Sequence, residues 1–228
     1  MIECIVENKR DAIHAEKLGV NRLELVSAIA VGGLTPSHGT IKTVLKSVHI
    51  PVQVMVRPHP YGFVYDTYDK EVMLEEIAFL NKLGHHRIVI GALRDNHKID
   101  TDFLDQLFKK FPEVDVTFHR AFDEVDDQME AYETLTRYSR NVKRILTSGG
   151  EDNCSAGIIN LSKLVQLQRE TKGPEILPGS GLDVDNITEI HEAVQAKEYH
   201  FGRGVRSNKS FEKGFNKKTV DEIKRILK

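Results

Sequence analysis

Short runs of β-branched and aromatic residues alternate with longer helical patterns along the chain, and this alternation occurs eight times. The expected strands cover residues 2–7, 22–26, 52–57, 87–91, 115–119, 143–147, 175–179 and 198–202. Their starts are 20 to 35 residues apart, which leaves room for a loop and a crossover helix between parallel strands. The alternation predicts an α/β fold. No linker divides it, so we expect one domain over residues 1–228.

Polar side chains recur on one face of several expected strands. Arg22 and Glu24 alternate with leucines, and Gln53, Met55 and Arg57 alternate with valines. An open doubly wound sheet is covered by helices on both faces, so its central strands should be apolar on both. A closed single-domain (β/α)8 TIM barrel of parallel strands explains the pattern better, because its polar face can line a lumen that opens into a site.

Composition restricts the class of protein. The chain is 40% hydrophobic and 29% charged, which is typical of a globular protein. Its net charge of −2 provides no field that would favour nucleic acid or an anionic membrane as a partner. Two cysteines make a disulfide framework implausible. Without a signal-peptide pattern or an apolar run of about 20 residues, we expect a cytoplasmic protein that does not enter the membrane.

The helices between the strands carry recognisable start signals. Thr35-Pro36 reads as an N-cap followed by proline at the first helical position. Residues 186–189 and 219–222 resemble capping boxes that begin with Asn186 and Thr219. These signals predict where three of the crossover helices start.

Charged and polar groups on the lumen-facing parity form the first set of candidate functional residues. They are Glu3, Glu7, Glu24, Gln53, Arg57, His119 and His200. Arg120 and Asp123 lie just beyond a strand end. Charges inside a barrel are costly unless they are paired or used. One interpretation is a structural ion-pair network, for instance Glu24 with Arg57. The other is a functional site at the C-terminal strand ends.

His119 stands out because it ends an expected strand. An imidazole there could be a general base or a metal ligand, or simply a histidine that is hydrogen-bonded to a carboxylate. In an enzyme, His119 would be the base, with Arg57 and Arg120 as anion clamps and Glu24 or Asp123 as the orienting carboxylate. No lysine ends a strand, and the sequence has no His-Glu-x-x-His or Cys-x-x-Cys motif.

Three glycine-rich turns follow the last three expected strands. Barrel enzymes often bind phosphate with the loops after strands seven and eight, through main-chain N–H groups. The same glycines could simply allow tight turns. The candidate anion-binding residues are Thr147, Ser148, Gly149, Gly150, Gly179, Ser180, Gly181 and Gly202.

Several strings in the chain occur in an order typical of one family. They are Glu3-Cys4, Arg22-x-Glu24-Leu25, the Gly-Gly-Leu-Thr-Pro-Ser of residues 32–37, Met55-x-Arg57-Pro58, the Thr-Phe-His-Arg-Ala-Phe-Asp of residues 117–123, the Leu-Thr-Ser-Gly-Gly of residues 146–150, and Pro178-Gly179-x-Gly181 with Asn186. In this order the motifs resemble those of the CutC-type copper homeostasis proteins. The similarity extends from the first expected strand to about the eighth.

The resemblance implies a barrel, a cytosolic location, an association with copper tolerance, copper(I) binding and an oligomer, with a dimer favoured. Many relatives carry a cysteine where this chain has Val26. Since copper(I) prefers soft sulfur ligands, the remaining candidate ligands are Cys4, Met55 and His200. By strand parity, however, Cys4 faces the helices and is expected to be a small buried hydrophobe.

The sequence thus leaves three classes of function open. The first is a copper homeostasis protein that binds copper(I) weakly. The second is a barrel enzyme that acts on a small anionic or phosphorylated substrate by His/Glu acid–base chemistry. The third is an interaction scaffold whose mouth has no remaining chemistry.

Overall fold

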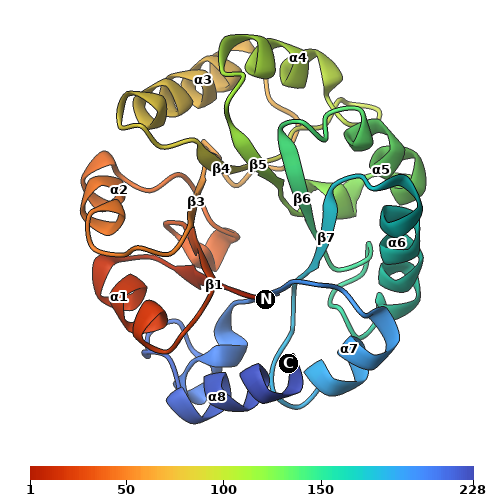
Figure 1. Cartoon of the computed structure of the whole chain (residues 1–228). Helices are drawn as coiled ribbons and strands as arrows, with labels where there is room; N and C mark the ends of the chain where they lie inside the picture. The colour runs from red at the N-terminus through yellow and green to blue at the C-terminus, as the bar shows by residue number, and fades with distance from the viewer.

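Eight parallel strands form a ring in the computed structural model, which describes residues 1–228 (Figure 1). Hydrogen bonds join the strands in the order β7-β6-β5-β4-β3-β2-β1-β8, and a parallel bridge between Gly179 and His200 closes the ring. The expected TIM barrel is confirmed. The strands are β1 (Ile2–Val6), β2 (Arg22–Leu25), β3 (Val52–Met55), β4 (Arg87–Ile90), β5 (Asp115–Phe118), β6 (Val142–Thr147), β7 (Glu175–Pro178) and β8 (Tyr199–Phe201).

Eight helices surround the ring of strands (Figure 1). Their inward faces bury aliphatic and aromatic side chains against the outward faces of the strands, which gives the main hydrophobic core. The helices are α1 (Lys9–Lys17), α2 (His38–Leu45), α3 (Thr67–Lys82), α4 (Thr101–Lys110), α5 (Gln128–Thr136), α6 (Ile158–Thr171), α7 (Ile187–Val194) and α8 (Lys217–Ile226).

The predicted helix starts are confirmed in part, because α7 begins directly after Asn186 as expected, whereas α2 and α8 begin at other residues. Helix α2 begins at His38, and Ser37 rather than Thr35 caps it by accepting the Thr40 N–H. Asn186 precedes α7, but its side chain makes no capping bond to that helix. Asn216 caps α8, so Thr219 lies within the helix. Several polar residues near each start could serve as caps, and the backbone angles select one of them.

The lumen has three levels along the barrel axis. At the N-terminal ends of the strands, a buried ionic network, which we call the base network, joins Arg22, Arg144, Asp115, Glu3 and Glu198. An apolar cluster lies above it and contains Ile5, Val26, Met55 and Val89. The polar mouth lies beyond this cluster, at the C-terminal ends of the strands. The lumen is therefore filled at its base and open at its mouth.

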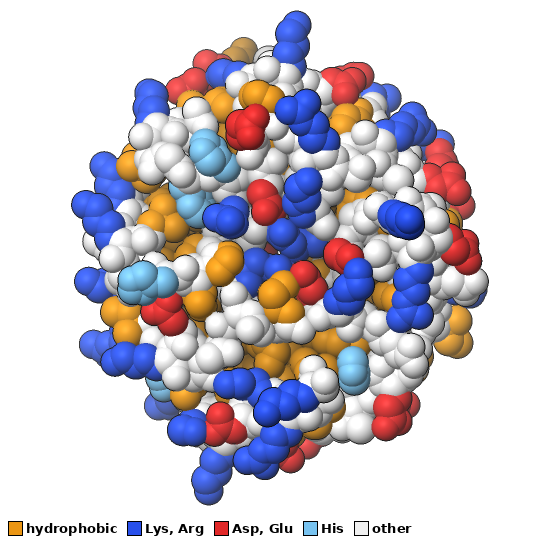
Figure 2. All heavy atoms as spheres, viewed as in Figure 1, with side chains coloured by type: hydrophobic (Ala, Val, Ile, Leu, Met, Phe, Trp, Pro, Cys, Tyr) orange, Lys and Arg blue, Asp and Glu red, His pale blue; other side chains and the backbone are white.

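The surface carries mixed charge. On the face shown in Figure 2, basic and acidic side chains are interspersed, and both kinds reach the centre of the ring. No helix combines the length and the apolar composition that crossing a bilayer requires.

Candidate functional site

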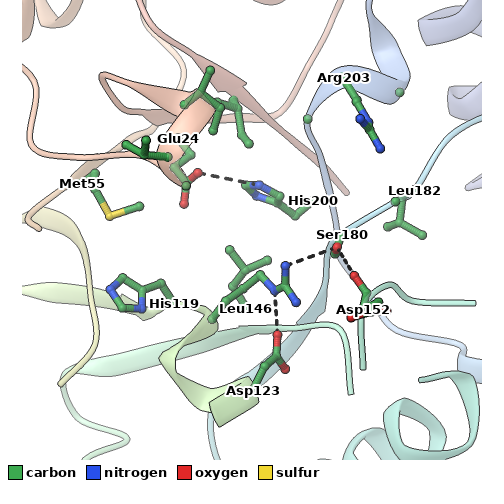
Figure 3. A pocket seen from close by; sticks show the side chains of 18 of the residues that line it. Glu24, Met55, His119, Asp123, Leu146, Asp152, Ser180, Leu182, His200 and Arg203 are labelled. Atoms are coloured by element: carbon green, nitrogen blue, oxygen red, sulfur yellow. Dashed lines mark hydrogen bonds and ion pairs between the residues drawn. The ribbon is translucent and has the colours of Figure 1, made fainter. Parts of the chain in front are cut away.

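A cavity of about 1170 Å³ opens at the mouth of the barrel. Figure 3 shows its lining side chains converging from separate strands and loops. The cavity brings together many of the residues that the sequence predicted for a site, namely Glu24, Met55, Arg57, His119, Arg120, Asp123, Gly150, Ser180, Gly181, His200 and Gly202. Side chains from all parts of the sequence thus meet at one place, as expected for a barrel of this type.

His200 lies between two buried glutamates. The register places Glu3 of β1 opposite His200 of β8, and Glu3 Oε1 lies 2.7 Å from His200 Nδ1. On the opposite side of the imidazole, His200 Nε2 lies 3.7 Å from Glu24 Oε2 (Figure 3). Glu24 Oε1 is buried and has no hydrogen-bond partner. Glu3 therefore orients the imidazole, and its second nitrogen faces Glu24 and the cavity.

The electrostatics of these groups differ because their partners differ. Burial opposes the charge of Glu3, but Arg22 and His200 outweigh it and hold its pKa at about 2. Burial raises the pKa of Glu24 to about 7, against the attraction of His200. Burial would lower the pKa of His200, but the two glutamates raise it overall. Glu24 can therefore gain or lose a proton near neutral pH, and its charge acts on that of His200.

The tautomer and charge of His119 do not suit the roles that the sequence suggested for it. The Ala121 N–H donates to His119 Nδ1 at 3.1 Å, so the neutral ring carries its hydrogen on Nε2, which has no partner. Burial, with a contribution from Arg57, lowers the pKa of His119 to about 3. This geometry argues against both a general base and a metal ligand at His119, because its free nitrogen is a hydrogen-bond donor. The alternative of a bond to a carboxylate is also not observed.

The loop after β6 binds a carboxylate of the protein itself, that of Asp123. Asp123 accepts hydrogen bonds from the main-chain N–H groups of Ser148 and Gly150 and from the hydroxyl groups of Thr147 and Ser148. The N–H of Gly149 donates to Thr147 Oγ1. The predicted external anion site at residues 147–150 is therefore wrong, since an internal carboxylate fills it.

Arg120 is likewise engaged within the protein. Its guanidinium donates to Asp123 at 2.7 Å, to Ser148 at 2.9 Å and to Ser180 at 3.3 Å. These contacts join the loops after β5, β6 and β7. Arg120 and Asp123 thus hold the rim of the mouth, in place of the predicted roles of anion clamp and orienting carboxylate.

The turns after β7 and β8 keep part of the predicted anion-binding capacity. Gly179 takes part in the bridge that closes the barrel, and the Ser180 hydroxyl donates to the carbonyl of Asp152 at 2.9 Å. The main-chain N–H groups of Gly181 and Gly202 have no acceptor within the chain, and both residues line the cavity. They are the remaining donors for an anion at this rim.

The predicted metal ligands fall on two sides of the barrel wall. Met55 and His200 line the mouth, whereas Cys4 is fully buried in the core between strands and helices. Adjacent strand residues point to opposite faces, so Glu3 enters the lumen and Cys4 cannot. The structure therefore removes Cys4 from the site and confirms its parity-based placement. Val26 faces the lumen beside Met55.

The ion pair suggested between Glu24 and Arg57 is not formed. Glu24 is level with Gln53 in the β2–β3 register, four residues before Arg57. At about 3.3 Å per residue, this offset separates the two levels by roughly 13 Å. Arg203 and Phe63 also line the cavity but were not among the residues predicted from the sequence. The position of Arg203 directly after β8 was the available signal.

Comparison with known proteins gives a consistent result. The model of the CutC family matches residues 1–205. A protein named CutC from Treponema denticola is 38% identical over 201 residues, which cover 88% of this chain and 80% of that protein. The human copper homeostasis protein cutC homolog is 36% identical over 201 residues, or 88% of this chain and 72% of the human one.

Solved structures agree with the sequence comparisons. The putative copper homeostasis protein CutC from Streptococcus agalactiae superposes with a TM-score of 0.81 at 31% identity, covering 89% of this chain and 97% of that one. N-(5'-phosphoribosyl)anthranilate isomerase from Pyrococcus furiosus gives a TM-score of 0.62 at 16% identity, covering 100% and 98% of the two chains, and shows a shared fold alone. On the family model and these relatives together, the chain belongs to the CutC family.

Proposed function

We propose that this chain acts in copper homeostasis and that it binds a copper(I) ion in the mouth of the barrel, between His200, Glu24 and Met55. The family and the names of its relatives support the copper role. The observation that carries the location is the free Nε2 of His200, which faces the Glu24 carboxylate at 3.7 Å. Glu3, Glu24 and His200 offer ligand atoms within 4.8 Å of one another.

The chemistry of the three donors suits this proposal. A histidine that binds a metal usually donates its other N–H to a carboxylate, and Glu3 is in that position for His200. Met55 extends its thioether toward the cavity (Figure 3), which adds the soft sulfur that copper(I) prefers. No thiolate reaches the mouth, so we expect weaker binding than at a cysteine site.

Titration with copper(I) in the presence of a competing chelator tests the site. We expect His200→Gln to weaken binding by about tenfold or more, because it removes the nitrogen ligand. Met55→Leu keeps the volume but removes the sulfur, and we expect a several-fold loss. Cys4→Ala is the matched control, since it removes the chain's other candidate sulfur ligand without touching the mouth. Absence of binding at micromolar copper, or a loss confined to Cys4→Ala, would contradict the site.

A second candidate function is acid–base catalysis on a small anionic substrate. It is favoured by the pKa of Glu24, which burial raises to about 7, because a catalytic acid or base works best near the ambient pH. Glu24 with His200 takes the role that the sequence assigned to His119. The free N–H groups of Gly181 and Gly202 would hold the anionic end of the substrate.

Amide NMR during a titration with inorganic phosphate tests this second function. We expect the largest shifts at Gly181 and Gly202, because a bound phosphate would accept hydrogen bonds from both amides. The Gly149 amide is the internal control, since it already donates to Thr147. Uniform small shifts, or none at tens of millimolar phosphate, would remove the support for an anionic substrate at this rim.

A further inference from the structure

Arg57 is the one buried arginine that has no carboxylate partner. Its exposed fraction is 6%, yet its guanidinium donates to the main-chain carbonyls of Val31 and Gly33, each at 3.3 Å, and lies beside the Tyr65 hydroxyl, while its Nε has no acceptor. The other buried arginines form ion pairs: Arg22 with Glu3 and Glu198, Arg144 with Asp115, and Arg206 with Asp11.

An unpaired buried cation is costly, because desolvation removes the interaction with water and the two carbonyls replace it only in part. The charge of Arg57 faces the mouth cavity, which its side chain lines. An anionic group in that cavity would supply the missing partner. The position of Arg57 therefore indicates the sign of a ligand.

His119 provides a second unused donor at the same level of the barrel. The register pairs Met55 with Val89 and Val89 with Thr117. Two residues further along each segment, Arg57, Gly91 and His119 therefore lie at the same height along the barrel axis. Gly91 has no side chain, and a Cβ there would lie 2.6 Å from His119 Nδ1. Glycine at this position therefore provides the space that the His119 ring occupies beside β4. His119 and Arg57 both pack on the Phe63 ring, with the His119 ring centroid at 4.8 Å and the Arg57 Cζ at 4.7 Å.

We propose that Arg57 and His119 bind the carboxylate of a small organic ligand in the mouth. The Nε–H of Arg57 and the Nε2–H of His119 are both buried donors without a hydrogen-bond partner. Neither of these two groups can accept a hydrogen bond. A carboxylate is a planar, singly charged acceptor that matches arginine geometry. A phosphate has more acceptor oxygens and more charge than these two donors satisfy. The site is separate from the copper ligands and goes beyond the proposed copper function.

Fluorine NMR with trifluoroacetate tests the proposal, with trifluoroethanol as the uncharged probe of similar size. We expect trifluoroacetate to bind the metal-free protein with a dissociation constant of about 1–10 mM, and trifluoroethanol not to bind. Arg57→Gln should weaken binding by about tenfold, since it removes the counter-charge. His119→Phe keeps an aromatic ring but removes the N–H, and we expect a loss of several-fold.

Arg203→Gln is the matched control. Arg203 also lines the cavity, but it is exposed at the rim, so its loss changes the charge of the mouth without removing a buried donor. Retained binding in Arg203→Gln with weakened binding in the other two variants supports the pair. Equal losses at Arg57 and Arg203, equal binding of trifluoroethanol, or no binding at tens of millimolar trifluoroacetate would overturn it. Thermal unfolding of each variant verifies the fold.

The outcome is separable from that of the copper titration. Arg57 is not a proposed copper ligand, so Arg57→Gln should bind copper(I) like the wild-type protein. Failure of copper binding with intact trifluoroacetate binding rejects the copper site alone. The converse result rejects the carboxylate site alone.

Discussion

At the scale of single residues, inward-facing charges of similar type differ in state because their neighbours differ. Glu3 contacts Arg22 and His200 and stays ionised. Glu24 is also buried, but its nearest cationic partner is His200 at 3.7 Å and Glu3 lies close by, so burial raises its pKa to about 7. One glutamate is therefore structural, and the other can exchange a proton near neutral pH.

This difference predicts how stability depends on pH in the metal-free protein. The folded pKa of Glu24 exceeds its ordinary value, so the folded state binds an extra proton between about pH 4.5 and pH 7. Its contribution to the free energy of unfolding therefore falls as pH rises through that window. We therefore expect the free energy of unfolding of Glu24→Gln, measured relative to that of the wild-type protein, to increase by roughly 2 kcal/mol as the pH rises from 5 to 8.

Urea unfolding at both pH values, in the presence of a chelator, measures this difference. Glu71→Gln, on the exposed face of α3, is the matched control and should give a difference that does not vary with pH. A constant offset between Glu24→Gln and the wild-type protein would show that Glu24 has an ordinary pKa.

At the scale of elements, every strand except β6 ends one or two residues earlier than the apolar pattern suggests. Arg57, His119 and Gly202 each lie just beyond β3, β5 and β8, in segments that begin to leave the sheet. This is the position where a side chain can turn into the mouth while the strand still fixes its backbone. A Cβ at Gly204 would lie 2.0 Å from the Leu182 carbonyl oxygen, so glycine is needed for the loops after β7 and β8 to pack together.

At the scale of the whole molecule, the base network closes the barrel end opposite the mouth. Arg22 reaches Glu3 and Glu198, and Arg144 bonds Asp115 at 2.9 Å. These groups come from β1, β2, β5 and β6 and from the residue before β8. The network therefore ties the first two strands to β5, β6 and the start of β8.

We expect Arg22→Met to lower the free energy of unfolding by about 3 kcal/mol, because Glu3, which is fully buried, would lose its cationic partner. Arg87→Met is the control. Arg87 is 48% exposed and lies 4.0 Å from Asp115, so we expect a change below about 1 kcal/mol. Equilibrium urea unfolding distinguishes the two, and similar small losses in both variants would mean that the base network adds little stability.

The sequence by itself determined the eight-fold alternation, the closed barrel, and the set of side chains that point inward. Strand parity placed Glu3, Glu24 and His200 in the lumen and Cys4 outside it, because successive residues of a strand face opposite sides. The motif strings were also sufficient to indicate the family.

Only the tertiary structure decided which inward groups meet. A pair between Glu24 and Arg57 was one interpretation of the sequence, but Glu24 faces His200, and Asp123 fills the loop that was a candidate for an external anion. Parity gives the direction of a side chain but not its height along the barrel axis. That height depends on the stagger between neighbouring strands, which is set by the closure of the whole ring and leaves no local pattern in the sequence.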